Sequence, residues 1–267
     1  MRAPAQFCSI FKNPGILFFL GLVTICLTTA CNGASAKESI NGLTLLAKDG
    51  SRSVWATAAD RQTAQDILGA IKKSSFQVCD DLQTECQFTV VVEVYPDQAS
   101  FDEYVMNPEM RGFFAISGQP HNIQMVSPAN PGSHKISYND GVSVAVHEFV
   151  HLALNKINTD LPTWLEEGTA VYVGPHNLYS TVCQSVFPFD LTPSFQQLEE
   201  DYNSVQAPDL FAYTLVDFIV TQYGMDKLNL LLRSPDKLEK ILGNSKGTFE
   251  VQWKQFMQAQ YRYNYSG

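Results

Sequence analysis

Several absences narrow the classes of protein to which these 267 residues can belong. The sequence has no repeat of fixed period and no segment biased enough in composition to be disordered, so it is not a repeat array or a low-complexity chain. Positive charge is in deficit: 18 Lys and Arg stand against 27 Asp and Glu, and the net charge is −9. An acidic surface argues against nucleic acid or anionic lipid as a main partner. Hydrophobic residues, at 45%, suffice for one large globular domain or a compact pair of subdomains.

A long apolar run is also missing from the N-terminus. Residues 15–30 form a run of about 16 apolar or small residues, whereas a membrane-spanning helix needs about 20. The run follows a segment that carries Arg2 and Lys12, and no acid occurs before residue 37. This pattern is typical of a secretion signal. The rest of the chain then carries a net charge of about −11.

Two cleavage sites compete at the end of this signal. "LTTAC", residues 27–31, resembles the lipobox of bacterial lipoproteins, in which Cys31 would be lipidated, although Thr28 stands where leucine is usual. "ASA", residues 34–36, resembles an ordinary signal-peptidase site. The pattern favours a lipoprotein anchored to the membrane through Cys31, with secretion or an uncleaved anchor as alternatives. All three place the folded part outside the cytoplasm, in the cell envelope, the periplasm or the medium.

Cysteine is scarce, and its spacing is informative. Two of the six, Cys8 and Cys26, lie in the signal. Cys79 and Cys86 are separated by "DDLQTE", and in an oxidising compartment we expect them to form a disulfide. Metal ligation by this pair is the alternative, but no second Cys or His pair lies nearby. Cys183 has no obvious partner and is expected to be a buried free thiol.

Hydrophobic periodicity predicts an α+β fold in two halves. A signal at residues 1–30 and a tether at residues 31–56 precede a mixed α/β half at residues 57–158, and a mainly helical half follows at residues 159–267. The elements expected in the α/β half are a helix over 57–82, a strand over 86–96, a short helix over 97–108, a hairpin over 111–128 and a long helix over 140–158.

The long helix carries "HEFVH", residues 147–151. Each helical residue advances by about 100°, so His147 and His151 lie about 40° apart on one face and their ring nitrogens can converge on one ion. Glu148 lies on the adjacent flank, where it can reach a water bound to that ion. This geometry suits metal-assisted hydrolysis.

The same residues could instead belong to an ordinary buried helix. Apolar residues surround them on nearly every side: Val142, Val144, Val146, Phe149, Val150, Leu152 and Leu154. Two histidines and a glutamate inside such a helix would each cost several kcal/mol if they were left unpaired. Because one Zn²⁺ ion would remove that cost, the pattern favours a zinc site.

A catalytic zinc needs a third protein ligand and an open fourth position. The metzincin pattern is excluded, because "LALNKI" after His151 supplies neither its glycine nor its third histidine. Downstream, "LPTWLEEGTAVY" predicts a helix in which Thr163 and Glu166 form a capping box. Glu167, about 100° further round, is then free to face the metal. A tight turn over 158–162 would bring it back beside His151.

"HEFVH" followed by "LPTWLEEGTAVY" resembles the gluzincin metallopeptidases, in particular the bacterial peptidase MA-like proteins, over about residues 85–262. The resemblance implies a zincin-like fold, with His147, His151 and Glu167 as zinc ligands and Glu148 as the base. The function it implies is zinc-dependent hydrolysis of peptide bonds in a peptide or protein substrate outside the cytoplasm. The alternative is an inactive zinc-fold lipoprotein that serves as a binding module of the envelope. The presence of Glu148, which is not needed to hold zinc, favours the enzyme.

The resemblance also suggests a hydrogen-bond donor for the reaction. Related gluzincins use a tyrosine of the helical subdomain to stabilise the oxyanion, which points to Tyr213. Tyr172 and His176 are alternatives, and Tyr213 also fits an ordinary core helix. His121 and His134 are expected to lie in solvated loops.

Two features depend on how far the resemblance holds. Thermolysin-type members place a carboxylate four residues after the ligand glutamate, but Val171 stands there, so the partner of the zinc histidine must come from elsewhere, for example a backbone carbonyl. The strand at residues 121–128 is expected to form the sheet edge that holds an extended peptide by β-augmentation. No Gly-x-Met-Glu-Asn segment precedes His147, which argues against an aminopeptidase.

Overall fold

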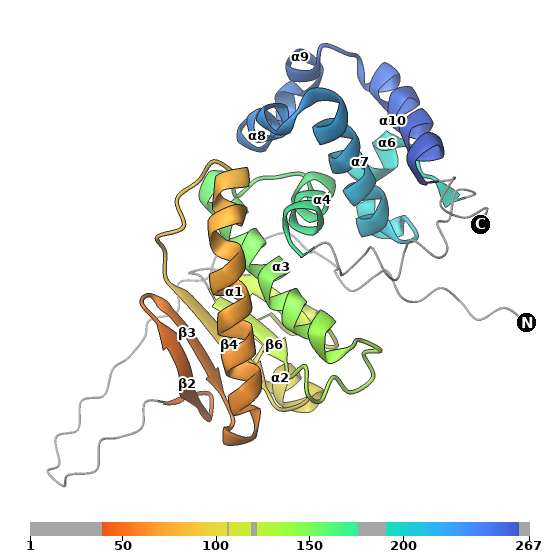
Figure 1. Ribbon diagram of the computed structural model, residues 1–267. Helices are drawn as coiled ribbons and strands as arrows, with labels where there is room; N and C mark the ends of the chain where they lie inside the picture. The colour runs from red at the N-terminus through yellow and green to blue at the C-terminus, as the bar shows by residue number, and fades with distance from the viewer. Residues whose placement is uncertain (1–38, 106, 119–121, 176–190, 262–267) are drawn as a thin grey trace, which may run out of the picture.

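A computed structural model describes residues 39–105, 107–118, 122–175 and 191–261 (Figure 1). The expected signal, the lipid site at Cys31, the thiol Cys183, and His121 and His176 lie outside these ranges. Within them, no helix is long and apolar enough to cross a membrane.

A six-stranded sheet forms the core of the α/β half, with the strand order β1-β2-β3-β4-β6-β5. The strands are β1 (Ser39–Ile40), β2 (Leu43–Asp49), β3 (Arg52–Ala56), β4 (Val90–Tyr95), β5 (Ala115–Gly118) and β6 (Asn122–Val126). β3, β4 and β6 are parallel neighbours, and the other pairs are antiparallel. The predicted hairpin is confirmed as β5 and β6.

The edge strand differs from the expectation. β6 pairs with β4 on one side, through Val92↔Ile123 and Val94↔Met125, and with β5 on the other. It is therefore an inner strand, and the prediction that residues 121–128 form the edge is wrong. Because the hairpin extends the sheet by one more strand, β5 is the edge strand on this side of the sheet among the described residues.

The predicted tether is also shorter than expected. Residues 39–56 form β1, β2 and β3, and pairing with β4 makes β3 an inner strand. Leu43, Val54 and Trp55 are buried in the core. The segment predicted as a tether over residues 31–56 thus contains three strands of the sheet.

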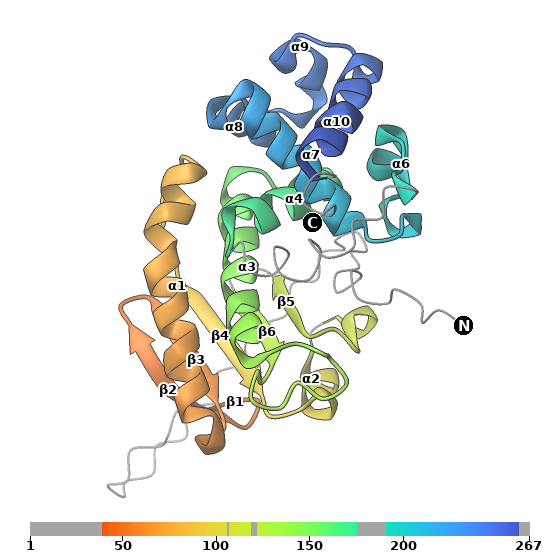
Figure 2. The same cartoon turned by 45° about the vertical axis from the view of Figure 1, so that its right-hand side comes forward.

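Two long helices pack side by side on one face of the sheet (Figure 2). They are α1 (Arg61–Asp81), in which Ala64, Ile67 and Ile71 are buried, and α3 (Tyr138–Ile157). The short helix α2 (Gln98–Tyr104) begins as predicted at Asp97, whose side chain accepts the N–H of Ser100.

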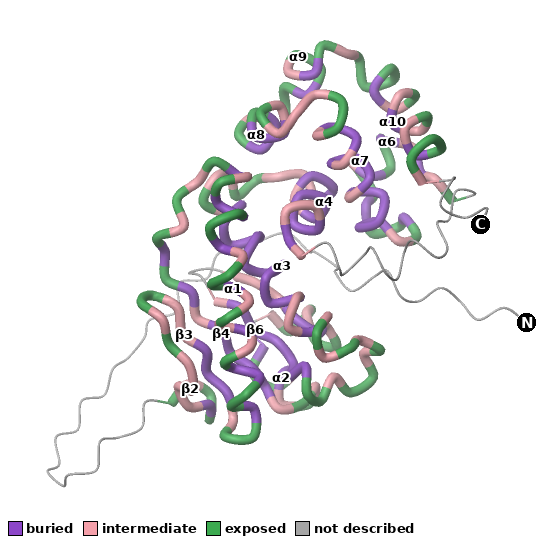
Figure 3. The backbone as a smooth tube through the Cα atoms, in the orientation of Figure 1, coloured by how far each residue is buried: buried purple, intermediate pink, exposed green. Residues whose placement is uncertain are grey.

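The helical half lies beyond the end of this layer (Figure 1). Its helices are α4 (Thr163–Val173), α6 (Phe195–Glu200), α7 (Pro208–Tyr223), α8 (Met225–Arg233), α9 (Leu238–Leu242) and α10 (Lys246–Tyr261). α4 is buried along most of its length and packs closely on α7 (Figure 3). At the contact, a Cβ on Gly168 would lie 2.4 Å from the carbonyl oxygen of Ala212. The helix predicted within "LPTWLEEGTAVY" is confirmed as α4.

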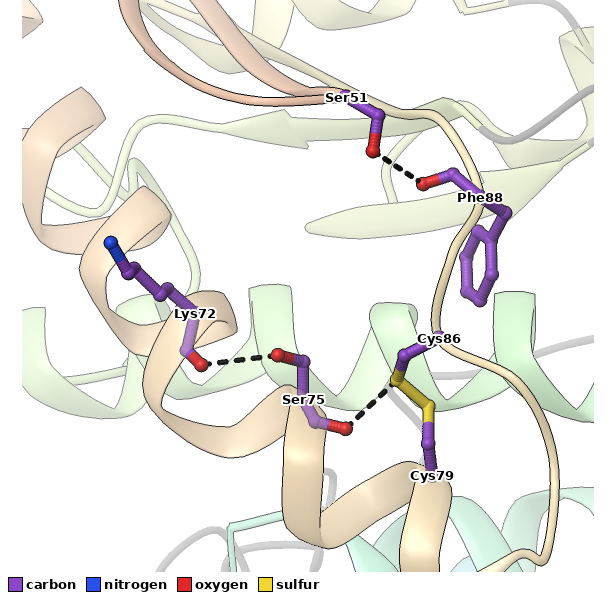
Figure 4. The surroundings of a disulfide bond; sticks show 6 residues. All are labelled: Ser51, Lys72, Ser75, Cys79, Cys86 and Phe88. Atoms are coloured by element: carbon purple, nitrogen blue, oxygen red, sulfur yellow. Dashed lines mark hydrogen bonds between the residues drawn. A yellow bond between two sulfur atoms is a disulfide. The ribbon is translucent and has the colours of Figure 1, made fainter.

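The predicted disulfide is confirmed. Cys79, in the last turn of α1, is bonded to Cys86, in the segment that leads to β4 (Figure 4). The Phe88 ring just beyond it stacks on Phe149 of α3. The disulfide thus closes a short loop between the helix layer and the sheet.

Candidate metal centre

α3 carries the first three residues of the candidate site. It begins where the Ser137 side chain accepts the N–H of Asp140, and it is buried from Val144 to Leu154. Within this stretch His147, Glu148 and His151 are 0%, 2% and 6% exposed. One rigid buried helix therefore fixes all three side chains, as the spacing predicts.

The ligand atoms of His147, His151 and Glu167 converge. The Nε2 atoms of the histidines lie 3.0 Å apart, and Glu167 Oε2 lies 3.7 Å from His147 Nε2 and 3.5 Å from His151 Nε2. Ligand atoms arranged tetrahedrally at zinc-bond lengths lie about 3.3–3.6 Å from one another. The observed separations scatter around this range, so the residues fit a metal ion.

The chemistry of Glu167 supports the same fit. Its carboxylate is buried, and Oε2 accepts no hydrogen bond from the described residues, although both histidine Nε2 atoms lie at ion-pair distance. A buried carboxylate oxygen without a donor is costly unless a cation satisfies it. The expected approach of Glu167 to His151 after the turn between α3 and α4 is confirmed.

Charge interactions dominate the site. Burial lowers the pKa of His151, but the negative charge of Glu167 and the hydrogen bond with Glu166 outweigh it and hold the pKa well above the usual value. Burial opposes ionisation of Glu167, but the two imidazoles hold its pKa below the usual range. Both groups therefore favour the charged form, and a divalent cation could replace the proton that His151 carries.

Glu148 has a different environment from Glu167. Burial raises its pKa above the ordinary value, and the two histidines oppose this only in part. Its Oε1 is buried and has no hydrogen-bond partner among the described residues. A carboxyl with a raised pKa and a free oxygen beside a metal site is suited to accept and return a proton.

Glu166 does not have the role that the sequence suggested. The N-cap of α4 is Pro162, so Thr163 is already helical and makes no side-chain cap, and the predicted capping box is absent. Instead Glu166 Oε1 lies 3.1 Å from Nδ1 of His151. The partner of His151 is thus Glu166, the residue before the candidate ligand Glu167. In the sequence, the only indication of this bond is that two glutamates, Glu166 and Glu167, are adjacent.

The candidate donors Tyr213 and Tyr172 lie together, with ring centroids 6.1 Å apart. Tyr213 hydrogen-bonds Tyr261, which in turn donates to Asp217. Tyr172 lies about 140° round α4 from Glu167, on the face turned toward α7. Among the described residues, these aromatic and hydrogen-bond contacts do not include the candidate metal ligands, and the catalytic role of Tyr213 stays a prediction.

His134 is not the solvated residue that was expected. It is half-buried, its Nε2 lies 2.7 Å from Gln98 Oε1, and its ring packs on Phe114. Burial lowers its pKa. The residue therefore fastens the loop before α3 to α2.

No protein-family model and no curated protein matches the chain. Its interpretation therefore rests on the residues themselves. The fold is mixed α and β, and it brings His147, His151 and Glu167 into a buried group that could bind a metal ion.

Proposed function

We propose that this protein is a zinc-dependent peptidase with a zincin-like arrangement of sheet and helices. The observation that carries the proposal is the convergence of two histidines and a glutamate, with Glu148 buried beside them and not needed as a ligand. This donor set suits zinc, which takes nitrogen and oxygen ligands and keeps an open position in catalytic sites.

The chain's own residues divide the chemistry between them. His147, His151 and Glu167 would hold Zn²⁺, which when bound polarises a scissile carbonyl and lowers the pKa of water. Glu148 accepts the proton of the attacking water and returns it to the leaving nitrogen, and its raised pKa suits both steps. Tyr213, on α7 packed against the helix that carries Glu167, is the candidate oxyanion donor.

The substrate would lie along β5, which is the free edge next to α3. An extended peptide can add to such an edge through main-chain hydrogen bonds and so be held without strong side-chain preference. This assigns to β5 the role that the sequence alone gave to residues 121–128.

We place the protein outside the cytoplasm, anchored by lipid on Cys31 or released after cleavage. The Cys79–Cys86 disulfide supports this location, because such bonds persist in oxidising compartments. Mass spectrometry of the mature N-terminus tests it: a lipid mass on Cys31, a chain beginning near residue 37, and an intact N-terminus identify the three cases.

The competing function is an inactive zinc-fold binding module. A comparison of wild type with Glu148→Gln distinguishes the peptidase from the binding module. The substitution conserves the shape of the side chain and leaves all three proposed ligands in place. We expect about one zinc per chain in both proteins, and cleavage of a mixed peptide library by wild type alone, with activity at least about 10³-fold lower in the variant. Zinc in both and cleavage in neither would establish the binding module.

A further inference from the structure

The C-terminal end of α1 is held by side chains of α8. The last carbonyls of a helix have no partner within it and need other donors. Asn229 Nδ2 donates to the carbonyl of Asp81 at 2.7 Å, and Arg233 Nη2 donates to those of Leu82 and Gln83 at 3.2 and 2.7 Å. These bonds join the α/β half to the helical half. We call this set of contacts the junction.

The disulfide closes the loop that presents those carbonyls. Cys79 and Cys86 bracket residues 80–85 (Figure 4). The N–H of Thr84 bonds back to the carbonyl of Cys79. Gln83 has a left-handed φ of 49°, which is unfavourable for a residue other than glycine. Its side chain donates to Asp226 of α8. A covalent closure keeps this strained loop in the shape that α8 recognises.

Packed helices connect the junction to the candidate metal ligands. α8 follows α7 after a single glycine, and α7 packs on α4 where Gly168 approaches the carbonyl of Ala212. α4 carries Glu167, whereas both histidines lie on α3. The separation of Glu167 from the histidines therefore depends on how the helical half sits on the α/β half, and the junction is one of the contacts that set this position.

The disulfide can be reached from solvent. An open hollow lies against it, lined by Phe76, Cys79, Asp80, Gln83, Thr84, Glu85 and Cys86. Cys79 is 5% exposed, while Cys86 is partly exposed. A thiol reagent would therefore attack the sulfur of Cys86. Asp80 and Glu85 would disfavour an anionic thiol, so the reagent that fits is a neutral or cationic dithiol.

We propose that the Cys79–Cys86 disulfide is a redox modification site whose reduction loosens the junction and weakens metal binding at His147, His151 and Glu167. A thiolate of the dithiol attacks Cys86 Sγ, and Cys79 leaves as a thiolate that takes up a proton. The second thiol of the reagent then displaces Cys86, which leaves as a thiol, and the reagent becomes a disulfide. Two electrons and two protons pass to the protein. The inference about the metal rests on the proposed zinc site.

The test compares oxidised wild type with Cys79→Ser/Cys86→Ser, using two measurements. Zinc affinity, from competition with a chromophoric chelator, should be about 3- to 10-fold weaker in the variant. Amide hydrogen exchange without zinc should be faster in the 80–85 loop, α8 and α4. Wild type reduced by a phosphine, which has no thiol to ligate zinc, should match the variant in both.

Two further variants separate coupling from loss of stability. Arg233→Met removes the main donor of the junction, so adding the double serine change to it should weaken zinc binding no further. Ile71→Ala removes a buried side chain of α1 away from the loop, and should lower stability while leaving zinc affinity unchanged. Wild-type affinity in the double-serine protein, full additivity with Arg233→Met, or an equal loss in Ile71→Ala would overturn the inference.

The measurements also distinguish this failure from that of the proposed function. If oxidised wild type binds no zinc, the peptidase proposal falls, and exchange in α4 and α8 still decides the coupling. Exchange that is the same with and without the disulfide would overturn the coupling whatever the metal does.

Discussion

At the scale of single residues, the adjacent glutamates Glu166 and Glu167 of α4 make different contacts. Glu166 bonds to Nδ1 of His151, and Glu167 lies with the candidate metal ligands. The positions of His147 and His151 could be predicted because one helix fixes their angle, and that of Glu167 because the connecting turn is short. Glu166 could not, since a capping box and a bond to histidine both suit a glutamate at that place. Pro162 decides between them: it is the N-cap and has no N–H for a capping glutamate to accept, and Glu166 turns toward His151.

Glu166 should matter for metal binding, although it is not a ligand. By accepting from Nδ1 of His151 it leaves the lone pair on Nε2, which faces the other ligand atoms. We expect Glu166→Ala to weaken zinc binding by about 10- to 100-fold. Glu199→Ala is the matched control. The Glu199 side chain is 22% exposed, close to the 19% of Glu166, and it forms its ion pair with Lys246 and not with a candidate metal ligand. Equal zinc affinities in the two variants would contradict the role.

At the scale of elements, the sequence was informative about local structure and less so about pairing. β4 followed from its β-branched run, and α1 and α3 from their apolar periodicity, because these patterns report the burial of a single element. The order of strands depends on contacts between distant segments. Nothing within residues 122–126 shows that β4 lies on one side of them and β5 on the other. The residues of β2 likewise carry no information about the strands with which β2 pairs.

The packing of α4 on α7 makes a direct prediction at Gly168. An added methyl group would lie 2.4 Å from the backbone oxygen of Ala212, so α4 must shift and carry Glu167 with it. We expect Gly168→Ala to destabilise the protein by about 1–3 kcal/mol and to weaken zinc binding. Gly69→Ala is the control: this helical position in α1 has open space around it, so stability should be unchanged or higher. Denaturant unfolding and chelator competition measure the two effects.

The free edge of the sheet offers a second element-scale prediction. Hydrogen-bonded pairs alternate along an antiparallel ladder, and the N–H of Val126 bonds to Phe114, so the N–H of Ser117 should point away from β6. Ser117→Pro then removes a donor to substrate and spares the hairpin. We expect at least about a tenfold loss of kcat/KM with zinc retained. Ser117→Ala also removes the hydroxyl that hydrogen-bonds Glu148 but keeps the N–H, so it measures the loss due to the hydroxyl alone. Equal losses in the two variants would exclude β-augmentation at this edge.

At the scale of the whole molecule, the candidate metal centre is where the two halves meet. α3 contributes two candidate ligands from the α/β half. α4, which packs on α7 within the helical half, contributes the third. A bound ion would therefore link the halves at the centre, as the junction of α1 and α8 links them at one side. A ligand that binds only the folded chain stabilises it by about 2.7 kcal/mol at 100 times its dissociation constant.

This linkage should depend on pH in a defined direction. Without metal, the raised pKa of His151 means that folding favours its protonated form. That contribution to stability is fully present below about pH 6.5, the unfolded value, and is lost as pH rises through the folded pKa. Zinc binds the neutral ring and must expel the proton. The affinity of the site for zinc should therefore rise by up to about tenfold per pH unit as pH rises toward the folded pKa of His151.

The zinc-induced rise in Tm should therefore grow between about pH 6 and about pH 8, where imidazole titration governs the competition. Calorimetric titrations in two buffers of different ionisation enthalpy should show about one proton released per zinc at pH 7. His134→Asn, which removes a titrating ring outside the site, should leave both results unchanged. A Tm rise that is independent of pH, with no proton released, would mean that His151 is already neutral before the metal arrives, and the carboxylates around it would then have to act on the bound state alone.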